Sequence, residues 1–494
     1  MKKSTYWLTN QFHQQLRSGA ALVSVLFLLS ACGPQVTLMS EAQEAKIGAQ
    51  QHDKIVESSG GVYDNPKLNA YVQNIMRRVA AASDRPDIPF QITILDTPMI
   101  NAFALPGGYT YVTRGLLGLA NSEAEVASVI GHEIGHVTAR HSAQRQTAAV
   151  GTGLAASVLG AVIGQKIGGS QKLVGNLLNV GGKAVLAGYS RGQEYEADDI
   201  GVKTSAMAGY KPAAAADFLA SLSRESRFQA NLKDRDRPAG SDWFATHPNT
   251  EERVARARGL AANFAGLSKT VKQGRATHFA AIDQITYGDS ADNGFVRGQS
   301  FTHPKLKVKF TVPKGYELTN GARAVVAQAS NGSKISFDMA KMKTASPREF
   351  VQTAWLKNDP AASYKDATVA GRPASIATVQ KNGAYYYFAA IQKAASAKAA
   401  KSDLSAYRFM MQSRGDGSKA FMSVLNSFKF LTNAQANKTK PSRIKIVTVQ
   451  KKDSLKSLAN LMAVSGQKVE RFRILNALPV GVPLKPGQRV KLIR

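Results

Sequence analysis

One segment of the chain, Ser122–Gln146, reads SEAEVASVIGHEIGHVTARHSAQRQ and has the spacing of a single helix. Ser122 and Glu125 at its start fit a capping box, which marks a helix N-terminus. His132 and His136 are four residues apart, about 400° around a helix, so both imidazoles project from one face. The two side chains can therefore reach one metal ion, with nitrogens about 2.0–2.1 Å from zinc.

Glu133 lies beside this histidine face and can hydrogen-bond a water at the metal without being a ligand itself. The competing interpretation is a surface helix that happens to carry two histidines. Gly131 and Gly135 count against it, because each glycine weakens a helix by about 1 kcal/mol. We therefore expect another part of the backbone to approach the helix closely at these glycines.

A catalytic zinc needs a third protein ligand and an open fourth position. The best downstream candidate is Glu194, in the segment SRGQEYEAD at residues 190–198. Asp198 follows four residues later and shares a helix face with Glu194. Glu196 points elsewhere on that helix and remains an alternative ligand.

His132-Glu133-x-x-His136 followed by Glu194-x-x-Ala-Asp198 resembles metallopeptidase family 48. The segment NAFALPGG at residues 101–108 is also similar to that family's sequence before the zinc helix. The resemblance covers about residues 41–265. It implies one Zn²⁺ per chain, Glu194 as the third ligand, and Asp198 as a carboxylate that orients a ligand histidine.

His247, followed by Pro248 and later by Arg253, resembles the family's segment downstream of the third ligand. We expect His247 to stabilise the tetrahedral oxyanion or to occupy the zinc's open site in a resting state. The alternative is a loop residue that packs on the helix. The implied reaction is peptide hydrolysis, in which zinc activates a water and Glu133 carries its proton to the leaving amine.

A strand predicted beside the zinc helix is the candidate for positioning substrate. It comprises Tyr109, Thr110, Tyr111 and Val112 and follows a Pro-Gly-Gly turn. An extended peptide that adds to an exposed strand edge binds through main-chain hydrogen bonds and tolerates many sequences.

The N-terminus has the features of an export signal over residues 1–31, with early basic residues and a short apolar run, Ala20–Leu29. Leu29-Ser-Ala-Cys32 resembles the bacterial lipobox, which implies lipidation of Cys32, the only cysteine in the chain. A plain signal peptide with an incidental cysteine is the alternative. The resemblance to outer-membrane lipoproteins implies a periplasmic protein anchored by lipid to the inner face of the outer membrane, and Gly33 lacks the acidic side chain that often marks retention in the inner membrane.

Charge divides the chain into two unlike parts. From Phe301 to the end there are 34 Lys and Arg against 9 Asp and Glu, a net charge of +25, whereas the whole chain carries +30. The second part should seek an anionic surface. Export argues against nucleic acid, and peptidoglycan is the expected polymer. The alternatives are acidic lipid head groups and a charge that merely keeps the domain soluble.

The 494 residues predict a zincin-type domain of α+β class at 32–270, mostly helical with a small sheet and of the HExxH gluzincin kind. Strand and turn patterns predict a second α+β domain with an antiparallel sheet at 300–432, whose opening resembles PsbP-like domains. Residues 443–494 resemble a βααβ LysM module. The apolar stretch 148–188 is interpreted as a buried helix pair or as a hairpin that faces membrane or substrate.

These features predict a zinc-dependent endopeptidase, and the family resemblance implies that it acts on misfolded or stalled envelope proteins. The alternative is a cell-wall-bound assembly or chaperone-like factor with little turnover. A peptidoglycan hydrolase ranks lower, because the zinc motif resembles that of a protein peptidase. We also expect residues 441–494 to be a tether that cleavage of a soluble peptide does not require.

Overall fold

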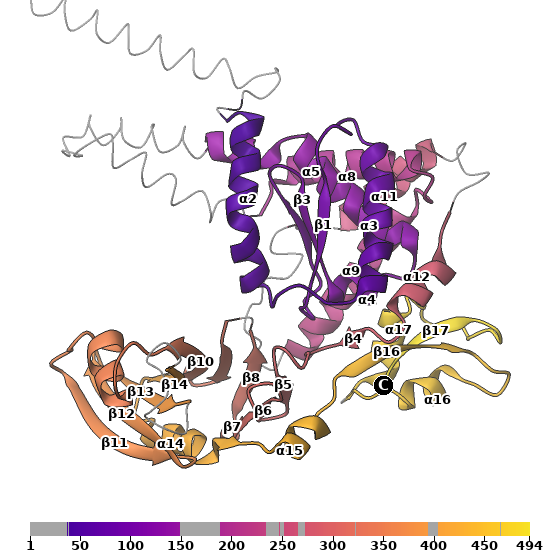
Figure 1. Ribbon diagram of the computed structural model, residues 1–494. Helices are drawn as coiled ribbons and strands as arrows, with labels where there is room; N and C mark the ends of the chain where they lie inside the picture. The colour runs from indigo at the N-terminus through magenta and orange to yellow at the C-terminus, as the bar shows by residue number, and fades with distance from the viewer. Residues whose placement is uncertain are drawn as a thin grey trace, which may run out of the picture. The chain divides into compact units, whose positions relative to one another are not determined.

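The computed structural model describes residues 37, 39–148, 188–233, 247, 251–264, 272–321, 323–393, 404–464 and 466–494 (Figure 1). The expected signal peptide, the lipidation site Cys32 and residues 149–187 of the apolar stretch lie outside these residues. The chain divides into two units, residues 1–44 with 140–185, and residues 45–139 with 186–494. In the first unit, the Arg140 guanidinium donates to the Glu44 carboxylate at 2.5 Å.

None of the helices in the described part of the chain is both long and apolar enough to cross a membrane. The helices before residue 283 are α2 (Glu41–Ser58), α3 (Pro66–Ala81), α4 (Arg114–Leu119), α5 (Glu123–Thr138), α8 (Arg191–Met207), α9 (Ala214–Lys233), α11 (Glu251–Asn263) and α12 (Arg275–Ile282). The helix predicted at residues 122–146 is present as α5 only as far as Thr138; the chain turns at Arg140, whose φ is +56°, so the prediction of a single helix to residue 146 is wrong. The Ser122 hydroxyl caps α5 by accepting from the Glu125 amide, and the Glu125 carboxylate accepts from the Asn121 amide.

The small sheet of this region contains β1 (Gln91–Leu95), β2 (Ala102–Leu105) and β3 (Tyr109–Thr113) in the order β1-β3-β2. β3 runs parallel to β1 and antiparallel to β2. Gly107 and Gly108 turn the chain between β2 and β3, with φ of +83° and +89°, values that glycine adopts without strain. β3 is thus the central strand.

The expectation that Tyr109–Val112 offers an exposed strand edge is therefore wrong. β1 and β2 pair with both sides of β3, and its backbone groups are used within the sheet. The segment Ala102–Leu105 escapes prediction as a strand, because AFAL is uniformly apolar and lacks the alternation that identifies a half-buried strand. It fills the side of β3 that we expected to be open.

Close backbone packing between α5 and α8 confirms the expectation drawn from the glycines of the zinc helix. A Cβ added at Gly131 would lie 2.8 Å from the carbonyl oxygen of Gly201, and one at Gly201 would lie 2.7 Å from the amide of His132. At Gly135 the added carbon would lie 3.1 Å from the carbonyl oxygen of Ala197. Glycine at these positions lets the two helices approach along the stretch that carries the site.

A second region, from residue 286 to 438, is built mainly of antiparallel strands, as its sequence pattern predicts. Its elements are β4 (Thr286–Tyr287), β5 (Phe295–Arg297), β6 (Ser300–His303), β7 (Val308–Thr311), β8 (Tyr316–Asn320), β9 (Val325–Ala329), β10 (Lys334–Lys341), α13 (Pro347–Glu349), η2 (Phe350–Trp355), β11 (Ala362–Val369), β12 (Arg372–Lys381), β13 (Ala384–Gln392), β14 (Ser405–Ser413), α14 (Ser418–Ser427), β15 (Lys429–Phe430) and α15 (Asn433–Lys438). Seven strands form one sheet, in the order β11-β12-β13-β14-β10-β9-β8, and four form another, β15-β7-β6-β5.

The C-terminal module comprises β16 (Ser442–Thr448), α16 (Leu455–Asn460), α17 (Lys468–Leu475) and β17 (Arg489–Ile493). This is the predicted strand–helix–helix–strand order, with β16 and β17 antiparallel. β16 also pairs with β4, and Ile444 and Ile474 belong to the same hydrophobic core as α3, α5 and α9. The module therefore shares a core with the helical region, which the sequence did not predict.

Candidate metal centre

Four buried side chains converge where α5 and α8 pack. His132 and His136 come from α5, Glu194 comes from the first turn of α8, and His247 comes from the segment before α11. One possible ligand atom from each lies within 4.8 Å of the others. His132 Nε2 is 3.0 Å from His136 Nε2, and each of these nitrogens is 3.6 Å from a Glu194 carboxylate oxygen.

This donor set fits a zinc ion. Two imidazole nitrogens and one carboxylate oxygen that converge in a buried place are the ligands of catalytic zinc sites. Glu133 strengthens the fit, because its side chain is fully buried and neither carboxylate oxygen has a hydrogen-bond partner among the described residues. An unsatisfied buried carboxylate is costly, and a water held at a metal would satisfy it.

Two further side chains hold the ligands in place. Asp198 Oδ1 lies 3.0 Å from His132 Nδ1, which leaves Nε2 of the same ring facing the cluster. The Arg253 guanidinium, 1% exposed, donates Nε and Nη2 to the two Asp198 oxygens, each at 2.7 Å. Its Nη1 is also 2.7 Å from Glu194 Oε2. One buried arginine on α11 therefore neutralises and orients both carboxylates of α8.

These contacts set the ionisation of the site. Burial alone would raise the pKa of Asp198, but the hydrogen bonds from Arg253 and His132 outweigh it and lower that pKa to about 2. Burial would likewise raise the pKa of Glu194, yet the neighbouring His247, His132 and Arg253 lower it. The pKa of Glu133 is raised, because burial outweighs the opposing charges of His247 and His132. Glu194 is thus kept ionised, as a ligand must be, whereas Glu133 is the more basic carboxylate.

His247 is fully buried and lies inside the cluster rather than in a surface loop. Its Nδ1 is 2.9 Å from Glu194 Oε1 and 3.3 Å from His132 Nε2, and its Nε2 is 3.6 Å from Glu133 Oε1. This position next to the ligands is what the resting-state interpretation requires. The structure places Glu196, the alternative third ligand, on the exposed side of α8 and outside the cluster.

Two neighbours of the cluster have no role that the sequence alone could assign. Arg253 belongs to the segment that resembles the family, but its pairing with Glu194 depends on how α8 and α11 pack. Tyr189, which immediately precedes the helix cap Ser190, stacks on the His136 ring. In the sequence, the only feature that marks Tyr189 is its place one residue before the capping box of α8. Its contact with His136 cannot be inferred from that position.

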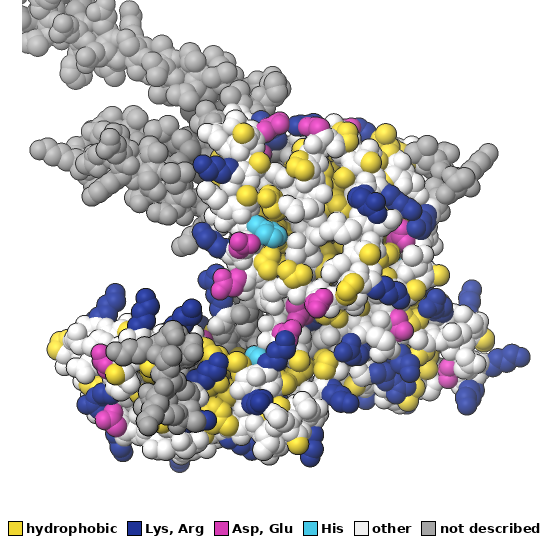
Figure 2. All heavy atoms as spheres, viewed as in Figure 1, with side chains coloured by type: hydrophobic (Ala, Val, Ile, Leu, Met, Phe, Trp, Pro, Cys, Tyr) yellow, Lys and Arg dark blue, Asp and Glu magenta, His cyan; other side chains and the backbone are white. Residues whose placement is uncertain are grey.

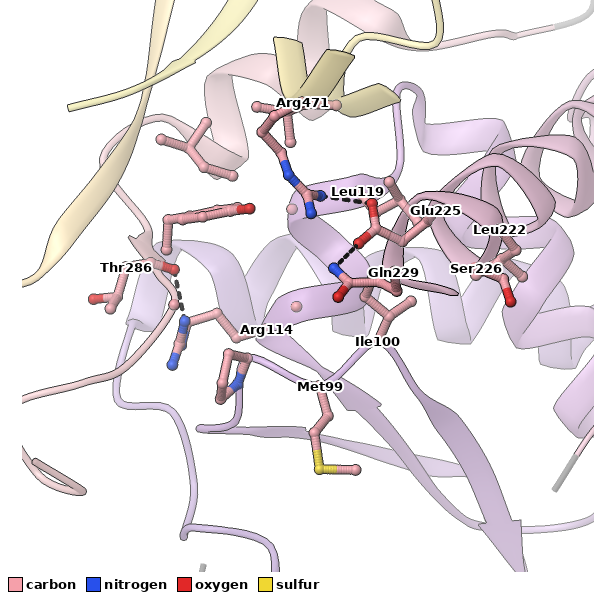
Figure 3. Close-up of a pocket in the computed structure, with 17 residues that line it drawn as sticks. Met99, Ile100, Arg114, Leu119, Leu222, Glu225, Ser226, Gln229, Thr286 and Arg471 are labelled. Atoms are coloured by element: carbon pink, nitrogen blue, oxygen red, sulfur yellow. Dashed lines mark hydrogen bonds and ion pairs between the residues drawn. The ribbon is translucent and has the colours of Figure 1, made fainter. Parts of the chain in front are cut away.

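A separate cavity of about 180 Å³ lies between α4, α9, β4 and the C-terminal module (Figure 3). Figure 3 shows Arg471 directed at Glu225, with Gln229 on the other oxygen of the same carboxylate; these contacts measure 2.6 Å each. Its lining contains none of the four cluster residues. This cavity belongs to the junction of helical region and module, not to the metal centre.

The site has two histidines and a glutamate on one buried helix, and the candidate third ligand is a glutamate on the helix that packs against it. This arrangement defines a gluzincin-type metallopeptidase site. Residues 66–261 match the model of Peptidase family M48, the family that the motifs resemble.

Three relatives illustrate the similarity. The beta-barrel assembly-enhancing protease of Escherichia coli is 29% identical over 45% of this chain and 45% of its own length. The metalloprotease LoiP of Escherichia coli is 35% identical over 29% of this chain and 55% of its own length. The mitochondrial metalloendopeptidase OMA1 of Arabidopsis thaliana is 34% identical over 35% of this chain and 32% of its own length. The chain thus spans about half or less of these relatives.

Proposed function

We propose that this protein is a zinc-dependent endopeptidase of the cell envelope that cleaves misfolded or stalled envelope proteins. The observation that carries the proposal is the fully buried Glu133, without a hydrogen-bond partner in the described structure, beside the converging His132, His136 and Glu194. A protein that only binds a metal has no need of a buried, unsatisfied carboxylate next to the ligands.

When bound, zinc supplies a Lewis acid that polarises the scissile carbonyl and acidifies a water molecule. Glu133 takes the proton from that water and gives it to the leaving amine, roles that suit a carboxylate whose pKa burial has raised. Asp198 holds the Nδ1 proton of His132 and so keeps Nε2 available as a donor atom. Arg253 keeps Glu194 and Asp198 ionised throughout.

His247 acts as the resting occupant of the fourth position in this proposal. Its Nδ1 is 2.9 Å from Glu194 Oε1, so the ring would be close enough to a metal held by the cluster to take the place of a water or the substrate carbonyl. Withdrawal of the imidazole opens the site, and the same ring can then donate to the oxyanion as it forms. Access for substrate is therefore coupled to the position of His247.

The substrate strand is reassigned from β3 to β2. Among the described residues β2 pairs only with β3, so its other side is an edge there, and Ala102 and Ala104 are buried. A substrate in extended conformation would add to β2 through main-chain hydrogen bonds, which gives wide tolerance of sequence. Misfolded chains, which expose extended segments, match that tolerance.

The envelope location rests on two supports. The export signal and lipobox-like Cys32 predict a lipid anchor on the inner face of the outer membrane. A relative named beta-barrel assembly-enhancing protease is consistent with substrates among envelope proteins. Mass spectrometry of the mature N-terminus tests the anchor, since a mature chain that begins elsewhere without lipid contradicts it.

Attachment to peptidoglycan is the proposed role of the basic C-terminal module. Figure 2 shows many Lys and Arg side chains and fewer acidic ones on the visible surface, in agreement with the net charge of +30 of the whole chain. Residues 441–494 contain 12 Lys and Arg against 2 Asp and Glu. The LysM resemblance points to glycan recognition. Co-sedimentation with purified sacculi should persist at about 0.5 M salt, where screening is nearly complete; binding that disappears there is merely electrostatic.

The decisive experiment combines zinc analysis with a peptidase assay on casein and a zymogram on sacculi, for wild type and Glu133→Gln. An endopeptidase binds about one zinc per chain and cleaves casein, and Glu133→Gln keeps the metal without cleavage. A zinc-loaded wild type that cleaves neither casein nor unfolded envelope proteins would favour an assembly factor. Cleavage of sacculi alone would show a peptidoglycan hydrolase.

A further inference from the structure

Among the described residues of the metal centre, Tyr189 makes the closest ring contact. Its phenol ring lies parallel to the His136 imidazole, with ring centroids 3.7 Å apart and an interplanar angle of 12°. The side chain is 9% exposed. Tyr189 directly precedes Ser190, the N-cap of α8, whereas His136 is in the last turn of α5. The stack therefore joins the ends of the two helices that supply the ligands.

We propose that Tyr189 is a positioning residue that fixes the His136 imidazole for metal binding. This inference rests on the proposed zinc site. Rotation of a histidine ring about χ2 is broad, so a ligand imidazole needs a neighbour that sets its plane. For His132 that neighbour is Asp198, 3.0 Å from Nδ1. For His136 the parallel Tyr189 ring sets the plane and leaves Nε2 directed at His132 Nε2 and Glu194.

Tyr189 also borders His247, the residue that must move in the proposed mechanism. Its ring centroid is 5.5 Å from that of His247, at an interplanar angle of 35°, and the His136 and His247 centroids are 5.2 Å apart. Tyr189 therefore lies beside both His136, a proposed ligand, and His247, which occupies the fourth position in the proposed resting state. Removing the ring would both loosen His136 and open a path for water beside the ligands.

The size of the effect follows from what supporting partners of metal ligands contribute. Mutation of residues that orient a ligand weakens metal binding about 10- to 100-fold. Because stacking is less directional than a hydrogen bond, we expect the lower end, about tenfold, when the ring is removed. A phenylalanine keeps the ring and should keep the affinity within about threefold.

The test measures zinc affinity of the full chain by competition with a chromophoric chelator, for wild type, Tyr189→Leu and Tyr189→Phe. Tyr195→Leu is the matched control, since Tyr195 is on α8 but its ring packs against Arg256. The expected result is about tenfold weaker binding for Tyr189→Leu and near wild-type binding for the other two. Thermal unfolding in excess chelator reports whether each variant is folded, independently of the metal.

Three outcomes would overturn the proposal. The first is a Tyr189→Leu protein that binds zinc as tightly as wild type, and the second is a Tyr189→Phe protein whose zinc affinity falls tenfold or more. The third is a Tyr195→Leu protein whose zinc affinity falls as much as that of Tyr189→Leu. The phenylalanine variant tests the proposal even if the leucine variant does not fold. Cobalt-substituted wild type and Tyr189→Leu should differ in their visible absorption, which reports ligand geometry. Because affinity is measured without substrate, wild type that binds zinc but cleaves no protein would refute the proposed function and leave this inference intact.

Discussion

The Nζ of Lys491, in β17 of the C-terminal module, lies 2.8 Å from the carbonyl oxygen of Gly118 at the end of α4. The same amino group donates to the carbonyls of Leu119 and Ala120, at 3.0 and 2.9 Å, and is fully buried, which lowers its pKa. A donor at a helix C-terminus satisfies carbonyls that lack intrahelical partners. This contact joins the module to the turn that leads directly into the zinc helix α5.

Replacing Lys491 by methionine should destabilise the protein by about 2 kcal/mol, because a buried carbonyl that loses its donor costs about 1–3 kcal/mol. The loss falls chiefly on Gly118, since the Leu119 and Ala120 carbonyls also accept from Asn121 Nδ2 and His278 Nε2. Lys445→Met, at an exposed position in the paired strand β16, is the control. Equal denaturant midpoints for the two variants would show that the buried contact contributes little.

Removal of residues 441–494 should abolish cleavage of soluble peptides as well as attachment to sacculi. This replaces the expectation from sequence that the segment is a dispensable tether. The deletion exposes the core that Ile444 and Ile474 share with the helical region, and it leaves β4 unpaired. Full peptidase activity and an unchanged unfolding temperature in the truncated protein would restore the tether interpretation.

Substitutions of the two carboxylates Glu133 and Glu194 should differ in their effects on metal content and on turnover. Glu133→Gln keeps the shape of the side chain and all ligands, so zinc remains while cleavage falls by about 10²–10⁴-fold, the usual contribution of a general base. Glu194→Ala removes a ligand and should lose the zinc. Metal analysis by mass spectrometry and casein hydrolysis measure the two effects; a Glu133→Gln protein without zinc would reverse the assignment.

Arg253→Met should cost about 3–5 kcal/mol of stability, because it leaves Asp198 and Glu194 buried without their cation. Arg256→Met is a matched control between the same two helices, since Arg256 pairs with Asp199 at about 40% exposure on both sides. An exposed pair of that kind contributes about 0–1 kcal/mol. Chemical denaturation of the two variants decides the matter, and similar losses would contradict a special role for Arg253.

Because of Asp198, the free energy of unfolding should fall as the pH is lowered. Burial favours its neutral form, but Arg253 and His132 lower the pKa to about 2, below the ordinary 3.8. A lowered carboxyl pKa stabilises the fold above about pH 4, and this contribution, roughly 2 kcal/mol, is lost as pH falls toward 2. The difference in unfolding free energy between wild type and Asp198→Asn, measured with a chelator present, should therefore shrink by roughly that amount between pH 5 and pH 2.5. A constant difference would rule out this origin of the acid sensitivity.

Local spacing determined much of the site in advance. The shared face of His132 and His136 follows from the geometry of one helix, and so does the shared face of Glu194 and Asp198. The glycines at 131 and 135 predicted a close neighbour, and α8 is that neighbour. These features involve residues within one or two turns of each other, where the period of the helix leaves little choice.

Contacts between distant segments were decided only by the tertiary structure. Arg253 reaches Glu194 and Asp198, and Tyr189 reaches His136, because of how α5, α8 and α11 pack. Tyr109–Val112 is not an edge strand because β2 pairs with it, and the uniformly apolar sequence of β2 does not predict a strand. Lys491 caps a helix more than 370 residues away in the sequence. The sequence by itself specified which residues carry the chemistry, because that depends on residue type and helical period; which residues support them depends on long-range packing, which no local pattern encodes.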